Sequence, residues 1–277
     1  MPSKNVLLKP VLKWVGGKRQ LLDEILPLLP ASPKLYVEPF LGGAAVLLAK
    51  QPKSALVNDA NSELINVYSV IRDQPDDLIE RLREHNSKNS SGYYYEVRAL
   101  DRSSSFASIS AVDRAARIIY LNKTCFNGLY RVNSAGQVNS PYGRYKNPNI
   151  VNEAGIRALS SYLQGDIKLT CGDYSLALKD LPRGAFVYLD PPYMPLNQTS
   201  SFTGYTEGGF SYDEQIRLRD ECLSLREQGI HFLQSNSDCE EIRSLYESFD
   251  IHTVQAKRSI NSKGSGRGAV NEVLICG

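Results

Sequence analysis

The sequence predicts an α/β protein with a long helical insertion. Short apolar runs typical of buried strands alternate with helical patterns in residues 34–59 and 167–277. Residues 62–163 lack such runs and carry apolar side chains at helical spacing instead. We therefore expect residues 1–61 and 164–277 to form one α/β domain and residues 62–163 to form a helical one.

The composition is ordinary for a soluble globular protein. Of the 277 residues, 42% are hydrophobic and 22% are charged, and the longest apolar runs are far shorter than a membrane span. The five cysteines are scattered without a C-x-x-C pair, and the three histidines lie far apart. We expect no disulfide framework, no metal site, no membrane association and a cytoplasmic location.

The charge is unevenly distributed although the net charge is only +2. Residues 114–152 contain six Lys or Arg and no acid, and residues 251–271 contain four more, again with no acid. The rest of the chain has 22 basic and 30 acidic residues, which gives it a net charge of −8. Two basic tracts on an acidic body predict a surface for a polyanion such as nucleic acid. Two solvated loops are the alternative.

The first motif lies in residues 10–29, where Gly16-Gly17-Lys18 precedes an expected amphipathic helix. It is not a phosphate-binding loop, because Leu12 and Arg19 stand where that pattern needs Gly and Ser or Thr. A Gly-Gly turn lets the backbone approach a ligand closely, and Lys18 can pair with a carboxylate. Trp14, the only tryptophan, is either a ligand contact or a core residue.

A strand over residues 34–38 is expected to lead through Gly42-Gly43 into a helix over residues 44–49. This resembles the first turn of a nucleotide-binding fold, but the third glycine of G-x-G-x-x-G is missing, so no pyrophosphate is implied. The next strand ends at Asp59, at the spacing of an acid that binds ribose. The alternative is that Asp59 caps a helix beginning near Asn61.

Helical periodicity in the insertion marks residues 64–71, 78–82 and 115–121. Its most unusual segments are residues 122–133 and 141–148, which are basic, aromatic and rich in Asn and Gly. This mixture suits contacts with phosphates and base edges and aromatic wedges between bases, and a hydrophobic core has no use for it.

The segment Asp190-Pro191-Pro192-Tyr193 follows an apolar strand over residues 185–189. Two prolines end that strand at once and leave a carboxylate at its carboxyl end, where open α/β sheets bind ligands. The Asp190 carboxylate and the Pro191 carbonyl can accept the two N–H groups of an amino group conjugated to a base, and Tyr193 can stack on that base. The alternative is a plain strand end with a Pro-Pro turn.

The remaining elements complete the sheet. A strand over residues 167–173 ends in Asp173, which can hold a ligand amino group. A helix is expected from Ser211 to Gly229, opened by a capping box with Glu214. Strands over residues 230–233, 252–256 and 272–276 and a helix from Cys239 follow, and polar loops are expected over residues 197–209 and 257–268.

Together these motifs resemble the alpha group of Dam-type DNA adenine-N6 methyltransferases, the GATC-methylating family, along essentially the whole chain. The motifs are Lys13–Lys18, Glu38–Gly43, Asn58-Asp59, Phe126–Arg131, Pro141–Tyr145 and Asp190–Tyr193. Phe126 is a small departure, because the family often has tyrosine there.

The resemblance implies a Rossmann-like methyltransferase sheet with a reversed last strand, S-adenosyl-methionine as methyl donor, and no metal. Residues 1–61 and 164–277 would be the catalytic domain, with catalytic residues Asp190, Pro191, Pro192 and Tyr193. The implied cofactor-binding residues are Trp14, Lys18, Phe40, Gly42, Asp59, Asp173 and Asp190. Lys18 would meet the cofactor's carboxylate, Asp59 its ribose and Asp173 its adenine amino group.

The resemblance further implies duplex DNA as the substrate, target recognition by residues 62–163, and base flipping. The implied DNA-binding residues are Lys123, Phe126, Asn127, Leu129, Arg131, Pro141, Arg144, Tyr145 and Lys146. Arg131 would read guanine in GATC unless it pairs with an acid of the fold, and Phe126 or a neighbour would support the vacated space. A cognate restriction endonuclease is a possible partner.

Two alternatives stay open. One is an amino-methyltransferase acting on cytosine, RNA or protein glutamine; related cytosine and glutamine enzymes usually carry Ser and Asn, respectively, at the position of Asp190. The other is an inactive DNA-binding regulator, which loss of Asp190 or of the Gly42-Gly43 turn would favour. Both features are present.

Overall fold

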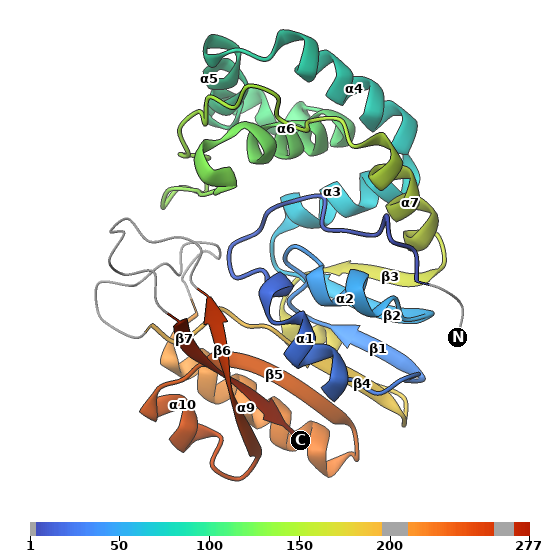
Figure 1. The fold of residues 1–277 in the computed structure, drawn as a ribbon, viewed down its shortest axis with the longest axis vertical. Helices are drawn as coiled ribbons and strands as arrows, with labels where there is room; N and C mark the ends of the chain where they lie inside the picture. Colours follow the sequence, from blue (N-terminus) through green and yellow to red (C-terminus); the bar gives the residue numbers. More distant parts are fainter. Residues whose placement is uncertain (1–3, 196–209, 258–268) are drawn as a thin grey trace.

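The computed structural model describes residues 4–195, 210–257 and 269–277. Seven strands in these residues form one sheet in the order β3-β2-β1-β4-β5-β7-β6 (Figure 1). The strands are β1 Leu35–Glu38, β2 Ser54–Asp59, β3 Asp166–Cys171, β4 Ala185–Leu189, β5 His231–Ser237, β6 Asp250–Lys257 and β7 Ala269–Cys276. The expected loops over 197–209 and 257–268 lie almost entirely outside the described residues.

The last strand is reversed, as predicted. Strands β1 to β5 pair in parallel, whereas β7 lies antiparallel between β5 and β6. The α/β sheet of a Rossmann-like methyltransferase is therefore confirmed. Because β7 runs backwards, its first residues lie at the edge of the sheet where the parallel strands end.

Helices cover both faces of the sheet. On one face, Tyr36, Phe186 and Tyr188 join the core that includes α2 Ala45–Lys50. On the other face, neighbouring strand residues pack with α9 Tyr212–Glu227 and α10 Glu240–Leu245. Inside strand β4 this alternation leaves no exposed residue, which explains its uninterrupted apolar run.

The amphipathic helix expected up to residue 29 is wrong in detail. This stretch forms three short pieces, Lys18–Gln20, α1 Leu22–Ile25 and Leu26–Leu28. Pro27 lies in the last piece and cannot donate a backbone hydrogen bond to the preceding turn.

The capping box expected at the start of α9 forms only in part. Ser211 accepts a hydrogen bond from the Glu214 amide as expected, but the Glu214 carboxylate lies 3.2 Å from Arg217 instead of binding back to the Ser211 backbone.

Five α-helices lie between β2 and β3 in the chain. They are α3 Ser62–Asp73, α4 Pro75–Lys88, α5 Ser91–Ala99, α6 Ala111–Thr124 and α7 Glu153–Leu163. In Figure 1, α4, α5 and α6 lie at one end of the molecule, and α3 and α7 lie between them and the sheet. The division into two domains at residues 61 and 163 stays a prediction, because α3 and α7 pack against strands as well as against the other helices.

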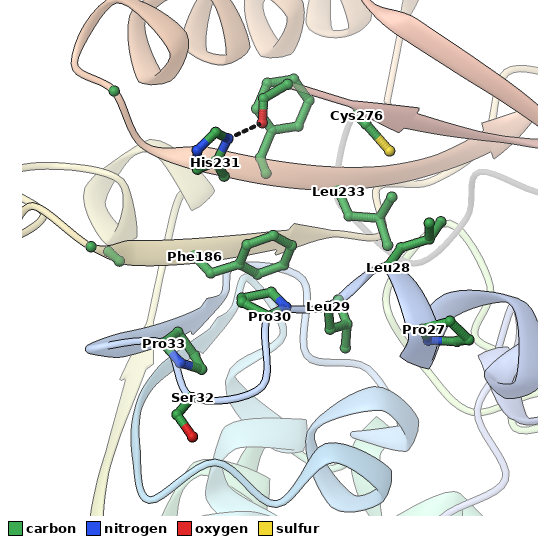
Figure 2. Close-up of a pocket in the computed structure, with 15 residues that line it drawn as sticks. Pro27, Leu28, Leu29, Pro30, Ser32, Pro33, Phe186, His231, Leu233 and Cys276 are labelled. Carbon is green, nitrogen blue, oxygen red and sulfur yellow. Dashed lines mark hydrogen bonds between the residues drawn. The ribbon is translucent and has the colours of Figure 1, made fainter.

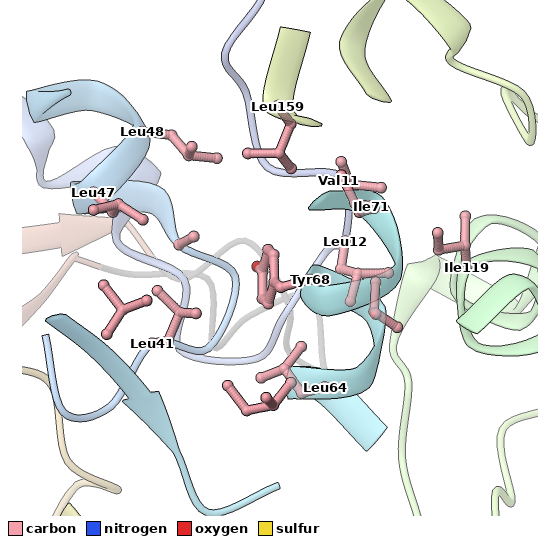
Figure 3. Packing of buried hydrophobic residues seen from close by; sticks show 14 of the residues in the cluster. Val11, Leu12, Leu41, Leu47, Leu48, Leu64, Tyr68, Ile71, Ile119 and Leu159 are labelled. Carbon is pink, nitrogen blue, oxygen red and sulfur yellow. The ribbon is translucent and has the colours of Figure 1, made fainter. Parts of the chain in front are cut away.

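One hydrophobic cluster runs from the sheet into these helices. Figure 3 shows Tyr68 of α3 between Leu41, which follows β1, and Ile71. Leu12 of the N-terminal segment and Ile119 of α6 belong to the same cluster. The first sequence motif is thus held between the sheet and the helices. Within the described residues, none of the helices has both the length and the apolar character needed to cross a bilayer.

Candidate active site

The turn after β1 is locked in place by two side chains. Asp59 accepts a hydrogen bond from the Gly42 amide at 2.9 Å, and the Tyr68 hydroxyl donates to the Gly42 carbonyl at 3.0 Å. Gly42 has a φ of +49°, and a Cβ atom there would lie 3.1 Å from the ring of Trp14. The turn therefore needs glycine, and Trp14 packs directly against it.

Asp59 holds the turn, and Asn61 caps the helix. The second oxygen of Asp59 accepts from the Asn61 amide at 2.9 Å, and the Asn61 side chain accepts from the Leu64 amide at the start of α3. Burial raises the pKa of Asp59, and the hydrogen bonds from Asn61 and Gly42 oppose that shift. The carboxylate thus lies where the ends of β1 and β2 meet.

Asp190 follows the end of β4, and only one of its two carboxylate oxygens is bound by other side chains of the described residues. Its Oδ1 atom lies 2.8 Å from Lys18 Nζ and accepts a hydrogen bond from Ser235 at 2.9 Å. Burial raises the pKa of Asp190, and Lys18 and then Ser235 work against this rise. Among the described residues, no donor reaches Asp190 Oδ2 or the Pro191 carbonyl. Within the described residues, two neighbouring acceptors at one strand end are therefore without a donor.

The backbone after Asp190 is anchored by side chains that the sequence analysis did not single out. Gln215 of α9 donates to the Pro192 carbonyl at 2.9 Å. Asn236 accepts from the Met194 amide at 3.2 Å, and Ser237 donates to the Met194 carbonyl at 2.7 Å. A signal was present in the sequence, because four consecutive polar residues, 234–237, follow the apolar start of β5 and are buried.

Tyr193 is held at both its hydroxyl and its ring. The hydroxyl donates to Glu272 of β7 at 2.6 Å, and Lys18 Nζ lies 4.5 Å from the ring centroid. Glu272 also escaped the sequence analysis, because nothing in the local pattern connects it with residue 193. Lys18 thereby contacts both ends of the Asp190–Tyr193 segment.

Glu38 is a buried carboxyl group behind this site. It accepts a hydrogen bond from the Tyr36 hydroxyl at 2.8 Å and is 2% exposed. Burial raises the pKa of Glu38 to about 8, with a smaller contribution from the negative charge of Asp190. Glu38 is therefore largely protonated at neutral pH and adds little negative charge beside Asp190.

Asp173 already has a cationic partner. Its carboxylate lies 2.5 Å and 3.0 Å from the two terminal nitrogens of Arg217 in α9 and also accepts from the Ser175 amide. The hydrogen bonds from Arg217, and less so those from Ser175, lower the pKa of Asp173 to about 2. The predicted aromatic contact Phe40 packs nearby, with its ring centroid 5.0 Å from that of Tyr174.

Comparison with known proteins identifies the chain. Residues 14–260 match the family described as D12 class N6 adenine-specific DNA methyltransferase. The chain belongs to this family. The predicted resemblance to adenine-N6 methyltransferases is thereby confirmed, whereas the alpha-group assignment and the GATC site stay predictions.

Individual relatives of this methyltransferase are similar along their whole length. The type II methyltransferase M1.LlaDCHI of Lactococcus lactis subsp. cremoris is 46% identical over 99% of this chain and 97% of its own. The type II methyltransferase M.MjaIII of Methanocaldococcus jannaschii is 42% identical over 96% and 98%, respectively. The DNA adenine methylase of Escherichia coli K12 is 35% identical over 95% and 93%. Members of the family use S-adenosyl-methionine as methyl donor, and this methyltransferase acts on adenine N6 in DNA.

The first motif of the methyltransferase is fastened to the predicted DNA-binding segment. The Asn122 side chain bonds both backbone groups of Lys13, at 2.9 Å and 2.8 Å. The ring of Trp14 stacks on that of Tyr130, with centroids 5.6 Å apart. Trp14 therefore packs against Tyr130 and lies beside the Gly42 turn, and its contact with a ligand stays a prediction.

The two unusual segments of the insertion lie side by side. The Phe126 amide donates to the Pro141 carbonyl, and the Gly143 amide donates to the Thr124 carbonyl, each at 2.8 Å. Phe126 is 55% exposed at the tip of the first segment. The remaining predicted residues of these segments are exposed or partly exposed: Lys123, Asn127, Leu129, Arg131, Pro141, Arg144, Tyr145 and Lys146.

The basic residues of the acid-free tract 114–152 fall into two groups. Arg114 and Arg117 form ion pairs within the helices, Arg114 with Glu63 at 3.1 Å and Arg117 with Asp101 at 2.7 Å. By contrast, Arg131 Nε is buried without a hydrogen-bond partner among the described residues. None of the ion pairs among the described residues includes Arg131, in contrast to Arg114 and Arg117.

Lys123 lies near another cation. Burial, and then repulsion from Arg19, lowers the pKa of Lys123.

A cavity of 520 Å³ lies away from all these residues. It is lined by residues 27–30, 32 and 33, by the starts of β4 and β5, and by the end of β7. Figure 2 shows His231 and Cys276 on one side of it and Pro30 and Pro33 on the other. These are the amino ends of the parallel strands, opposite the edge that carries Asp59 and Asp190. The polar side chains at the carboxyl ends of the strands, rather than the size of this cavity, define the candidate active site.

The raised pKa of the buried Glu38 predicts how the stability of the fold depends on pH. A carboxyl group whose pKa rises from 4.5 to about 8 on folding contributes stability that is complete below about pH 4.5 and is lost as the pH rises toward 8. We expect Glu38→Gln to gain stability relative to the native chain across this range, by at most about 1.4 kcal/mol per pH unit. Urea unfolding between pH 5 and 8.5 measures the difference. A difference as flat as that of Glu24→Gln, an exposed control in α1, would refute the assignment.

Proposed function

We propose that this methyltransferase methylates adenine N6 within GATC in duplex DNA after flipping the base into the site formed by Asp190–Tyr193. The observation that carries the proposal is the pair of available acceptors at the end of β4, Asp190 Oδ2 and the Pro191 carbonyl. An amino group has two hydrogens, and these two acceptors match them.

The chemistry follows from the electronic state of the amino group. Its lone pair is delocalised into the adenine ring, so the nitrogen is a poor nucleophile. Hydrogen bonds to Asp190 and Pro191 draw it toward a tetrahedral state and stabilise the positive charge that develops on it. Lys18 and Ser235 hold Asp190 by its other oxygen and so fix the direction of the available one. S-adenosyl-methionine, when bound, supplies an activated methyl group.

The residues around the Gly42 turn fit this cofactor. We assign its binding to Trp14, Lys18, Phe40, Gly42, Asp59, Asp173 and Asp190. The Gly42 turn lets a ligand approach the backbone, and the half-buried Asp59 carboxylate stands beside it for the ribose hydroxyls. An adenine amino group bound by Asp173 would share that carboxylate with Arg217.

The paired segments of the insertion form the proposed DNA-binding surface. Arg131 is the proposed guanine reader, since arginine meets the two acceptors of guanine in the major groove. Arg144 and Lys146 are exposed and are assigned to phosphates, which position the protein without reading the sequence. Phe126 is exposed and would occupy the space left by the flipped base. We assign Lys123, Asn127, Leu129, Pro141 and Tyr145 to the same surface.

Two further assignments belong to this proposal. Type II methyltransferases are 42–46% identical to this chain, which supports a cognate restriction endonuclease as its partner. The absence of paired cysteines from the sequence supports a reducing, cytoplasmic environment.

The central prediction is that Asp190→Ala lowers the rate of methyl transfer by about 100-fold or more, because the nitrogen loses one of its two acceptors. Methylation of plasmid DNA by purified protein, read by digestion with nucleases that sense adenine methylation, measures the effect. Asp220→Ala, which removes an exposed acid paired with its neighbour Arg219, is the control. Near-native turnover by Asp190→Ala would refute this role of Asp190 in the mechanism.

The cofactor assignment predicts that Asp59→Ala and Lys18→Ala weaken binding of S-adenosyl-methionine while binding of DNA alone stays nearly unchanged. Each variant loses a charged hydrogen-bonding group, which typically contributes about 1.5–3 kcal/mol. Calorimetric titration with the cofactor gives the affinity, and Asp23→Ala, an exposed acid of α1, serves for comparison. Unchanged affinity in both variants would show that the ribose and carboxylate contacts lie elsewhere.

The sequence assignment predicts different behaviour for two cations. Arg131→Ala should relax the choice of the first base, because a bidentate arginine contributes about 1–3 kcal/mol of discrimination. Lys146→Ala should weaken binding to all sequences equally and lower its salt dependence. Sequencing the methylated adenines and titrating binding at several salt concentrations separates the two. Arg131 is not the reader if its alanine variant still methylates only GATC at normal efficiency.

A further inference from the structure

The hydrogen bond between Tyr193 and Glu272 joins the proposed catalytic segment to the reversed strand. The donor and acceptor oxygens are 2.6 Å apart, within the short range typical of a hydroxyl that donates to a carboxylate. None of the sequence motifs contains Glu272, although this residue binds the hydroxyl of Tyr193.

The topology explains how Glu272 reaches the site. In β7, Glu272 lies opposite Ser237 of β5 and Val254 of β6. Ser237 is the last residue of β5, so Glu272 stands at the edge where the parallel strands end. A parallel strand in the same place would present its own end there, whereas the antiparallel β7 presents its beginning.

The ring of Tyr193 is restrained at three points. Its hydroxyl is bound to Glu272, the Lys18 ammonium lies over the ring, and the next residue is anchored through the Met194 amide to Asn236. Burial raises the pKa of the Tyr193 hydroxyl well above its ordinary value, so the hydroxyl remains a donor. A carboxylate can only accept, which fixes the direction of this hydrogen bond.

We propose that Glu272 is a positioning residue that holds the ring of Tyr193 in the orientation in which it stacks on the target adenine. This inference rests on the proposed role of Asp190–Tyr193 in binding the base. The bond is not needed to keep β7 in place, because the strand pairs with β5 on one side and with β6 along its whole length on the other. Its consequence therefore falls on the ring.

The test compares single-turnover methyl transfer at saturating DNA and cofactor for Glu272→Ala, Glu272→Gln, Tyr193→Phe and the double variant Tyr193→Phe/Glu272→Ala. We expect Glu272→Ala and Tyr193→Phe each to slow transfer about tenfold or more, because a small displacement of a positioning group is costly. Glu272→Gln keeps an acceptor and should recover most of the rate. The double variant should be no slower than either single variant, because both remove the same bond.

A spectroscopic readout separates ring position from general damage. A duplex with 2-aminopurine at the target position fluoresces when the base leaves the helix and is quenched when an aromatic ring stacks on it. We expect the complex of Glu272→Ala to be brighter than that of the native chain, and Glu272→Gln to resemble the native chain. Glu247→Ala, at an exposed position before β6, is the matched control and should change neither rate nor emission.

The outcomes distinguish this inference from the function beneath it. If the native chain methylates adenine and Glu272→Ala matches it in rate and emission, the positioning role is wrong and the proposed function stands. Additive losses in the double variant, or no recovery by Glu272→Gln, also overturn the role. If the native chain modifies no adenine in duplex DNA, the proposed function itself fails. Tyr193→Phe leaves β7 untouched and so tests the same bond should Glu272→Ala fail to fold.

Discussion

The ion pair between Lys18 and Asp190 is the contact on which the site depends. It connects an N-terminal turn with the end of β4, two parts of the chain that are more than 170 residues apart in sequence. Lys18 is only 5% exposed, so each charge would be costly to leave without the other. The same ammonium lies over the ring of Tyr193, and Ser235 donates a hydrogen bond to the Asp190 oxygen that Lys18 contacts. Neutralisation of the carboxylate and orientation of its second oxygen are thus achieved by one contact.

The second organising relation is between the site and the insertion. Asn122 binds the backbone of Lys13, and Trp14 lies between the Gly42 turn and Tyr130. The segment proposed to read DNA is therefore fastened to the motif proposed to bind the cofactor, rather than attached through a flexible linker. A displacement of either segment would be transmitted to the other through the stacked rings of Trp14 and Tyr130 and the two hydrogen bonds of Asn122.

Local sequence patterns predicted those parts of the fold that local physics decides. Strand β4 matches its expected bounds because a continuous apolar run is ended by two prolines. The stretch before residue 29 forms three short pieces although its apolar spacing looked helical, and Pro27 accounts only for the break after Ile25. Asp190 and Tyr193 were predicted from the sequence, whereas the contacts of Ser235, Gln215 and Glu272 with this segment were not. Their roles arise from neighbouring strands and from α9, and a single sequence does not show which strand lies next to which.

The position of β7 also bears on when the enzyme becomes competent. Strands β5 and β6 are both synthesised before β7, yet they flank it in the sheet. While residues 269–276 are still inside the ribosome, β5 has an open edge and Tyr193 has no Glu272 to bind. The sheet is completed by the strand that arrives last, and the support for the aromatic ring arrives with it. Until β7 has joined the sheet, the ring of Tyr193 therefore lacks the contact that we propose orients it.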